Sequence, residues 1–267
     1  MPSPKRLGKA ERRRQILLAL RMSPHVRVTE LAARFGVTTE TVRRDMDALG
    51  AEGLLTRAHG GASAPVPGHR DMHERRLERV TIREQLGRFA ASFVSDGDTI
   101  MIDAGTTTME FARALSLAER RVTAITNSLQ VAMVLGQSRA ARIRLAPGTY
   151  MPEEAAIVGT EACEYLSGYN VDACYLGGAG LGEKGVTEIV EGFDAIKRTM
   201  MRQSAECRFL IDSSKFGRTF LSRVAECSEI GTLITDAPPG AALTRLLGHP
   251  TQVIVAPPPN ETRIDGA

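Results

Sequence analysis

The sequence predicts two domains of different fold class. The first is a winged helix-turn-helix, mainly α with a small β wing, and the second is an α/β domain with a mainly parallel sheet. Three observations predict this: helical patterns and a glycine-rich hairpin fill residues up to 63, prolines and a glycine cluster at 64–68, and strands alternate with helices from about residue 81. The length of 267 residues is sufficient for two domains.

Helical periodicity organises the N-terminal part of the chain. We expect helices at 11–22, at about 29–35 and at 39–49, then a strand at 54–57 that leads into a hairpin tip at 58–61. Thr29 is a candidate N-cap for the second helix, which Gly36 ends. Thr38 is placed to cap the third helix, whose apolar residues share one face.

The later part of the chain alternates strands with helices. The predicted strands are 99–102, 122–126, 143–146, 173–176, 209–211, 233–234 and 253–255. The predicted helices are 82–94, 107–115, 129–135, 191–204 and 241–247. We therefore place the winged helix-turn-helix domain at 9–63, with its helix-turn-helix at about 26–45, a linker at 64–80, and the α/β domain at 81–257.

Composition argues against several classes of protein. The chain is 43% hydrophobic and 24% charged, as globular proteins are, and no apolar run approaches the ~18–20 residues of a membrane span. The charged N-terminus precedes no apolar segment with a cleavage site, so we expect no secretory signal. The 4 cysteines include no Cys-x-x-Cys pair, which favours reduced thiols in the cytoplasm over a zinc site or a disulfide framework. We expect no metal and no cofactor.

Positive charge is concentrated near the N-terminus. Residues 1–63 contain 12 Lys and Arg against 6 Asp and Glu, a net charge of +6, whereas the remaining residues have a net charge of −3. A basic module joined to a mildly acidic body is typical of a domain that binds a polyanion. A solvated basic surface explains the same numbers, so charge alone leaves both interpretations open.

The expected third helix carries side chains suited to DNA on its early, outward face, namely Thr38, Thr39, Thr41, Arg43 and Arg44. Threonine hydroxyls bond phosphates or base edges, and one arginine can bind guanine O6 and N7 together. Arg57 and His59 lie where a wing would reach DNA, and candidate phosphate contacts on the first helix are Lys9, Arg12, Arg13 and Arg14. Packing or solvated surface explains each feature alone; their order within about sixty residues indicates DNA binding.

Two motifs in this region resemble the DeoR family of bacterial transcription regulators. The first runs from Val37-Thr38 to Thr41-Val42-Arg43-Arg44-Asp45, and the second is Arg57-Ala58-His59-Gly60-Gly61-Ala62. The resemblance continues through the second domain. Because one winged helix contacts too little DNA for genomic specificity, we expect a homodimer or higher homo-oligomer on double-stranded operator DNA.

Four loops that follow predicted strands carry small, polar or charged residues, and in a parallel sheet such loops share the edge where ligands collect. They are 103–108 with its Gly105-Thr106-Thr107, then Thr126-Asn127-Ser128, then glycine-rich 177–180, and finally 212–217 with Lys215. Backbone amides, hydroxyls and a lysine are suited to phosphate. An ordinary capped strand-to-helix loop explains the first of these segments about equally well.

These loops resemble the C-terminal sensor of DeoR-type regulators, which is similar in fold to ribose-5-phosphate isomerase and binds phosphorylated sugars or related metabolites. The resemblance implies an effector site made by Asp103, Gly105, Thr106, Thr107, Thr126, Asn127, Ser128, Gly177, Gly178, Asp212 and Lys215. Segment 146–151 departs from the family pattern of Gly-Gly followed by Arg. We expect this loop to contribute to effector choice, so the identity of the effector is not carried over.

Three functions are compatible with these features. We expect a cytoplasmic transcriptional repressor of carbohydrate or polyol catabolism that a phosphorylated sugar-type effector releases from DNA. The alternative is a sugar-phosphate isomerase-like enzyme with a DNA-binding appendage. The isomerases carry Asp-Gly-Ala-Asp-Glu where this chain has Gly177-Gly178-Ala179-Gly180-Leu181, so we expect binding without catalysis. A third possibility is a sensor domain that serves only in assembly.

Overall fold

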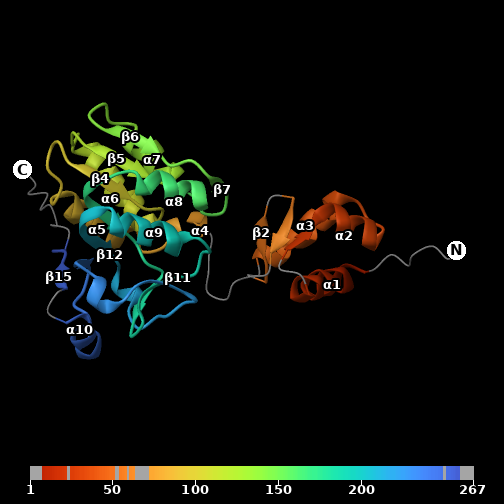
Figure 1. The fold of residues 1–267 in the computed structure, drawn as a ribbon. Helices are drawn as coiled ribbons and strands as arrows, with labels where there is room; N and C mark the ends of the chain where they lie inside the picture. The colour runs from red at the N-terminus through yellow and green to blue at the C-terminus, as the bar shows by residue number, and fades with distance from the viewer. Residues whose placement is uncertain are drawn as a thin grey trace, which may run out of the picture. The chain divides into compact units, whose positions relative to one another are not determined.

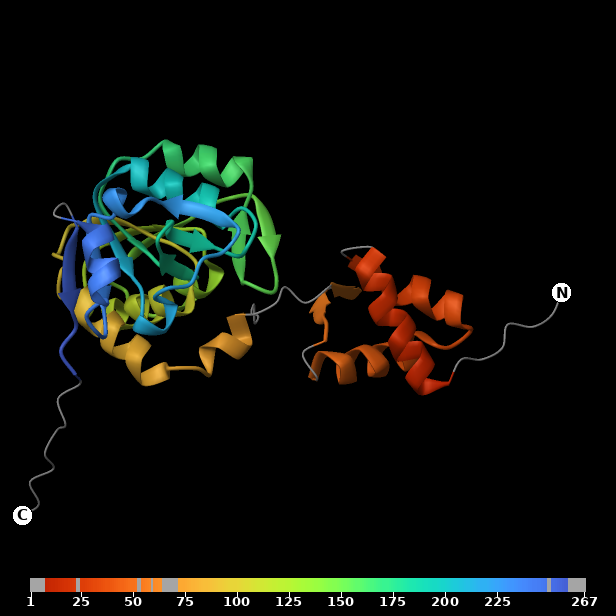
Figure 2. The same cartoon turned by 90° about the horizontal axis from the view of Figure 1, so that it is seen from below.

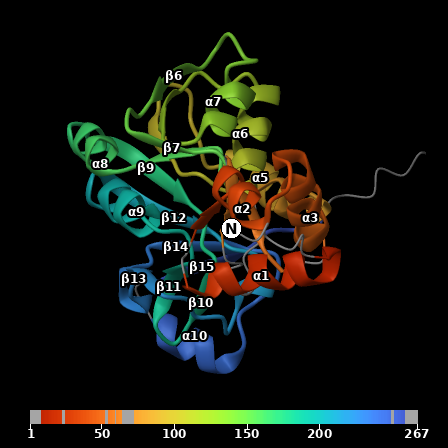
Figure 3. The same cartoon turned by 90° about the vertical axis from the view of Figure 1, so that its right-hand side faces the viewer.

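The computed structural model describes residues 8–22, 25–51, 54–58, 60–63, 72–248 and 251–258. The chain divides into two compact units, Met1–Asp71 and Met72–Ala267. Each unit has its own hydrophobic core. The helices and strands of both units are labelled in Figures 1 and 3. Among the described residues, no helix combines the length and the apolar character needed to cross a membrane.

The first unit contains three helices and a small antiparallel sheet. The helices are α1 (Lys9–Met22), α2 (Val28–Phe35) and α3 (Thr39–Ala51). The strands are β1 (His25–Arg27), β2 (Thr56–Ala58) and β3 (Gly61–Ser63), in the order β1-β3-β2. The predicted helices and hairpin are confirmed, whereas β1 was not predicted. Ile16, Phe35 and Met46, one from each helix, are buried together in the core.

The ends of α2 and α3 show which capping predictions hold. Thr29 is not the N-cap of α2: the helix begins at Val28, and Arg27 occupies the cap position without a side-chain hydrogen bond. Gly36 ends α2 in the left-handed conformation with φ of 64°, as its lack of a Cβ allows. Thr38 caps α3, because its Oγ1 accepts a hydrogen bond from the Thr41 amide at 3.2 Å.

The second unit is built on a seven-stranded, wholly parallel sheet, which confirms the predicted fold class. Its strand order is β15-β14-β12-β9-β4-β5-β6. The bounds are β4 (Thr99–Ile102), β5 (Thr123–Thr126), β6 (Arg142–Leu145), β9 (Val171–Leu176), β12 (Ser204–Leu210), β14 (Thr232–Thr235) and β15 (Gln252–Val255).

Helices cover both faces of this sheet (Figure 2). One layer contains α5 (Val80–Ala91), α6 (Thr106–Leu117) and α7 (Leu129–Leu135); the other contains α8 (Thr160–Ser167), α9 (Phe193–Arg202) and α10 (Ala241–Leu247). Side chains alternate along a strand, so Ile100 and Ile102 face the first layer and Met101 faces the second. Strands buried on both faces are continuous apolar runs, which is why they were predictable from sequence.

Shorter elements complete the second unit. They are α4 (Met72–Arg76), the hairpin β7 (Thr149–Met151) and β8 (Ala156–Val158), and the antiparallel sheet of β10 (Gly180–Gly182), β11 (Gly185–Glu188) and β13 (Ser222–Ala225). None of these was predicted. The strands have only three or four residues and show too little periodicity, and α4 lies within the expected linker. Helix α8 was not predicted either. Helix α9 ends at Arg202, earlier than expected, because Ser204 already begins β12.

The register of the sheet brings the ends of four strands to one edge. Ile102 pairs with Thr126 and with Tyr175, and Leu176 pairs with Phe209. The loops that follow β4, β5, β9 and β12 therefore emerge side by side, as the sequence predicted.

Candidate functional site

Helix α3 presents two arginines away from the core of the first unit. The side chains of Arg43 and Arg44 are 56% and 78% exposed, and both lie near the Glu40 carboxylate, at 4.0 and 3.2 Å. Thr39 is exposed as well, whereas the Thr38 and Thr41 hydroxyls bond each other at 2.9 Å. Two exposed guanidinium groups on one helix can reach base edges or phosphates.

Two arginines of α1 make contacts that were not predicted. Arg12 Nε contacts the buried carboxylate of Asp45 at 2.8 Å, and Arg13 Nε lies 3.5 Å from the same group. These ion pairs fasten α1 to α3, so Arg12, with a side chain only 13% exposed, is a packing residue rather than a free phosphate contact. Arg14 is 70% exposed and pairs with Glu11 on its own helix.

The expected wing is β2 and β3. Arg57 lies in β2, where its backbone pairs with Ala62 of β3. His59 lies outside the described residues. The antiparallel β2–β3 hairpin thus has the backbone of a wing.

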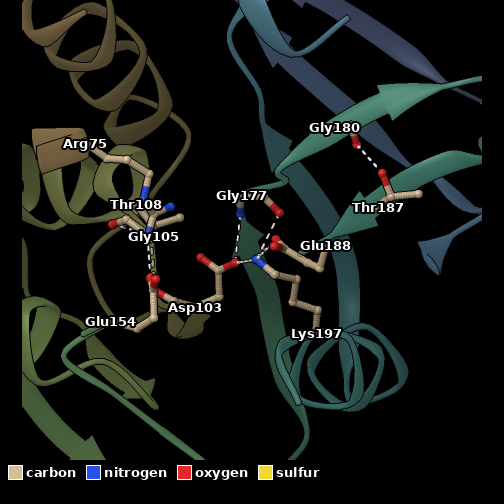
Figure 4. Close-up of polar contacts among 10 residues, drawn as sticks. All are labelled: Arg75, Asp103, Gly105, Thr108, Glu154, Gly177, Gly180, Thr187, Glu188 and Lys197. Atoms are coloured by element: carbon tan, nitrogen blue, oxygen red, sulfur yellow. Dashed lines mark hydrogen bonds and ion pairs between the residues drawn. The ribbon is translucent and has the colours of Figure 1, made fainter. Parts of the chain in front are cut away.

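In the second unit, a lysine and two acids meet in the interior (Figure 4). The Lys197 ammonium forms an ion pair with Asp103 and contacts Glu188 Oε1 at 3.1 Å, and it donates to the Gly177 carbonyl at 3.0 Å. Asp103 Oδ2 also accepts from the Gly177 amide at 2.9 Å. Burial lowers the pKa of Lys197, but the Asp103 and Glu188 charges outweigh it and hold the pKa above its ordinary value.

Lys197 and Glu188 were not predicted from the sequence. Phe193, Ile196 and Met200 form the buried face of α9, and Lys197 lies within that face. A lysine inside an apolar helical stripe needs a buried partner, because an unpaired charge is costly away from water. The position of Lys197 within an apolar helical face was therefore the sequence signal that could have identified it as part of a buried ion pair.

Two acceptor atoms at this edge of the sheet are left without partners. Asp103 Oδ1 and Asn127 Oδ1 are both buried and accept no hydrogen bond from any described residue. The opposite atom of each group is engaged: Asp103 Oδ2 with Lys197, and Asn127 Nδ2 with the Ile157 carbonyl at 2.9 Å. Asp103 Oδ1 also lies 3.9 Å from where a Cβ on Gly105 would be, so it is close to the Gly105 backbone. Buried acceptors fixed in this way are suited to ligand hydroxyls.

The hydroxyls of the neighbouring loops divide into two groups. Thr108 Oγ1 donates to the Asp103 and Gly105 carbonyls, Thr126 Oγ1 accepts from the Ser128 amide at 3.0 Å, and Ser128 caps α7. These residues hold the loops in shape. In the described part of the chain, the Thr106 and Thr107 hydroxyls make no hydrogen bond, and they lie on the first turn of α6, where helix amides have no internal partner.

Cations gather around the loop after β12. Burial lowers the pKa of Lys215; Asp212 opposes this shift, whereas Arg83, Arg75 and Arg218 add to it. Arg83 is 4% exposed, and burial lowers its pKa too. Arg75 Nε and Arg83 Nε are buried donors that lack a described partner. The other nitrogens are engaged, because Arg75 forms an ion pair with Glu154 and Arg83 Nη1 donates to the Arg75 carbonyl. The two Nε donors are suited to an anion. Sequence reasoning missed both arginines, because Arg75 was assigned to the linker and Arg83 was given no role within the predicted helix 82–94.

The other predicted residues of this site are in supporting positions. Asp212 accepts hydrogen bonds from the Ser214 amide and hydroxyl at 3.0 and 2.5 Å. Gly178 packs so closely that a Cβ would lie 2.8 Å from Val186 Cγ1. The structure thus brings the predicted residues to one edge of the sheet and adds Lys197, Glu188, Arg75 and Arg83 to them.

Two family assignments cover this architecture. Residues 12–67 match the DeoR-like helix-turn-helix domain, and residues 78–237 match the DeoR C terminal sensor domain. The chain belongs to the DeoR family. Membership accounts for both units, since one is a helix-turn-helix domain and the other a sensor. The chain is therefore a DNA-binding transcriptional regulator.

Several relatives in the DeoR family match over most of their length. The HTH-type transcriptional repressor GlcR of Bacillus subtilis (strain 168) is 34% identical over 230 residues, which is 85% of this chain and 88% of the relative. The Glycerol-3-phosphate regulon repressor of Escherichia coli (strain K12) is 30% identical over 246 residues, 90% and 96% of the two chains. Among solved structures, ribose 5-phosphate isomerase A from Methanocaldococcus jannaschii is 19% identical with a TM-score of 0.37, covering 50% of this chain and 53% of the other.

Proposed function

We propose that this protein represses genes of carbohydrate or polyol catabolism in the cytoplasm and leaves its operator when a phosphorylated sugar-type effector binds the second unit. The observation that carries the proposal is the pattern of unpaired polar atoms at one edge of the sheet. Asp103 Oδ1 and Asn127 Oδ1 are acceptors without a described partner, and Arg75 Nε and Arg83 Nε are donors without one. A molecule with hydroxyls at one end and an anionic group at the other satisfies both sets.

Electrostatics determines which end of the effector goes where. A phosphate is repelled by the Asp103 carboxylate, so we place the hydroxyls beside Asp103 and Asn127. The phosphate then lies near Arg83, Lys215 and the first turn of α6, where cations and free amides attract it. Names of two relatives support the repressor role: GlcR is named a transcriptional repressor, and the Escherichia coli relative a glycerol-3-phosphate regulon repressor.

We favour binding without turnover over the isomerase alternative. Aldose–ketose isomerisation needs a carboxylate free to act as a base. The glycine-rich segment after β9 supplies none, and Asp172, at the other end of β9, accepts from the Thr99 amide at 2.8 Å. One Asp103 oxygen is already engaged in an ion pair with Lys197. Incubation with pentose and hexose phosphates tests the choice, because formation of an isomerised product would overturn it.

The DNA-binding role is tested by selecting a binding sequence from random duplexes and comparing two exposed arginines. Arg44→Ala is expected to weaken binding to the selected sequence by about 1–3 kcal/mol if Arg44 bonds a base edge, with a smaller loss on random DNA. Arg14→Ala, on α1, is the matched control and is expected to weaken both DNAs alike. Equal losses on both DNAs for Arg44→Ala would contradict the base-reading role.

The effector site is tested by thermal-shift screening of phosphorylated sugars and polyols. A ligand at 100 times its dissociation constant is expected to stabilise the protein by roughly 2.7 kcal/mol. Lys215→Ala and Thr106→Val are each expected to reduce that stabilisation while leaving binding to the selected DNA unchanged. If the ligand-induced thermal shift were unchanged in both variants, the proposed position of the phosphate would be wrong.

A further inference from the structure

Arg79 joins the start of the second unit to the loop proposed to hold the effector's phosphate. Its guanidinium contacts Asp212 Oδ1 at 3.1 Å and Asp236 Oδ2 at 2.9 Å. Both carboxylates are buried, whereas the Arg79 side chain is 35% exposed. Asp236 also accepts from the Ser213 amide at 2.6 Å, so these contacts tie Arg79 to the loop that begins at Asp212.

Arg75 makes a second connection, to the other end of the proposed site. It forms an ion pair with buried Glu154, and the nearby Met72 amide donates to the Glu153 carbonyl at 3.0 Å. Glu154 lies in the turn between β7 and β8, and β8 bonds the Asn127 segment through the Ile157 amide at 2.7 Å. Residues 72–80, which we call the connector, are therefore attached to both groups of effector-site loops.

The backbone of the connector is held in an unfavourable conformation where these contacts meet. Arg79 has φ of 48°, in the left-handed region that residues with a Cβ avoid, and it occupies the N-cap of α5 without a side-chain cap. Such a conformation persists only when surrounding contacts impose it. Removal of the Arg79 ion pairs therefore favours a different path of the chain between α4 and α5.

We propose that the connector is a latch which the anionic group of the effector opens. An anion beside Arg83 and Lys215 repels Asp212 and offers Arg79 a new partner, so Arg79 leaves the carboxylates that hold it. The connector begins the second unit and follows the DNA-binding unit in the sequence, so its release is the proposed step between effector binding and loss of DNA binding. This inference rests on the proposed effector site and adds the element that transmits its occupancy.

Hydrogen–deuterium exchange on the full chain, with inorganic phosphate as the probe, tests the latch. Phosphate is expected to raise amide exchange in the connector by roughly 5-fold or more, the lower end of typical allosteric coupling. Asp236→Asn weakens the hold on Arg79 without altering Asp212 or Lys215. This variant is expected to show fast connector exchange without phosphate. Because coupling is reciprocal, it is also expected to bind phosphate more tightly by the same factor.

Arg76→Gln is the matched control, because Arg76 lies in α4 and makes no ion pair with any described residue. It is expected to leave both exchange and phosphate affinity unchanged. If phosphate raises the melting temperature but leaves connector exchange unaltered, the latch is wrong and the effector site stands. If Asp236→Asn behaves like Arg76→Gln, the latch is also wrong. If phosphate does not stabilise the wild-type protein, the anion site fails and the latch fails with it.

Discussion

Lys197 stands between two carboxylates in the interior of the second unit, with side-chain exposures of 2% for Lys197, 1% for Asp103 and 7% for Glu188. One lysine against two acids leaves the cluster with an excess of negative charge. Donor groups of a ligand offset that excess, whereas an anion increases it. The cluster therefore fixes the orientation of Asp103, and in the proposed effector site we expect it to favour hydroxyls over phosphate on its side.

Lys197→Met is expected to destabilise the second unit by about 3–5 kcal/mol, because two buried carboxylates lose their counter-charge. The pKa of Lys197 is held above its ordinary value, so its stabilisation is complete at neutral pH and is lost only as pH rises through that raised pKa. Urea unfolding of the wild-type protein and of Lys197→Met at pH 6 and pH 8 measures the difference in their free energies of unfolding. That difference is expected to be the same at both pH values. Lys184→Met, in the exposed turn after β10, is the control. Equal stability of the two variants would contradict the buried-charge role.

Helices α5 and α6 pack backbone to backbone where α5 has a glycine. A Cβ on Gly87 would lie 2.6 Å from the backbone carbon of Glu110 and from the amide nitrogen of Phe111. Backbone cannot move aside as a flexible side chain can. This contact fixes the position of α5, and Arg83 lies one turn before Gly87 on the same helix. The packing of two helices thus sets the place of a proposed phosphate ligand.

Gly87→Ala is expected to lower stability even though alanine is the better helix former. The higher helix propensity of alanine stabilises the variant by at most about 1 kcal/mol, whereas overpacking against a rigid neighbour destabilises it by about 1–3 kcal/mol. Denaturant unfolding measures whether Gly87→Ala lowers or raises the free energy of unfolding. Arg88→Ala, at the next and exposed position of α5, is expected to change stability by less than about 0.5 kcal/mol. A more stable Gly87→Ala protein would show that the helices can separate freely.

The whole molecule combines a basic DNA-binding unit with an acidic sensor. A single winged helix buries too little DNA surface for specific recognition in a genome, and symmetric half-sites overcome this limit. We expect at least a dimer, assembled through residues after 71. Light scattering at micromolar concentration, with and without the selected DNA, measures it, and a truncated chain starting at Met72 is expected to keep the same oligomeric state. A monomer under both conditions would contradict this expectation.

Much of the architecture was predictable because its signals are local. Strand β4 at 99–102 and helices α7 at 129–135 and α10 at 241–247 have the predicted bounds. Thr38 and Gly36 cap helices as their chemistry indicates. Thr29 was assigned wrongly, since packing of Val28 and Leu31 into the core, rather than capping, decides where α2 begins. The short strands β10, β11 and β13 exist only through pairing between distant segments, which no local pattern encodes.

The sequence by itself determined the two-unit organisation, the parallel sheet and the loops that gather at one edge of it, because periodicity and the alternation of strands with helices follow from neighbouring residues. The tertiary structure decided which polar groups are paired within the protein and which polar atoms lack a partner there. Arg12 pairs with Asp45, 33 positions away, and Lys197 pairs with Asp103, 94 positions away. The charge state and orientation of a side chain depend on such distant partners and on burial, and both arise only when the chain is folded.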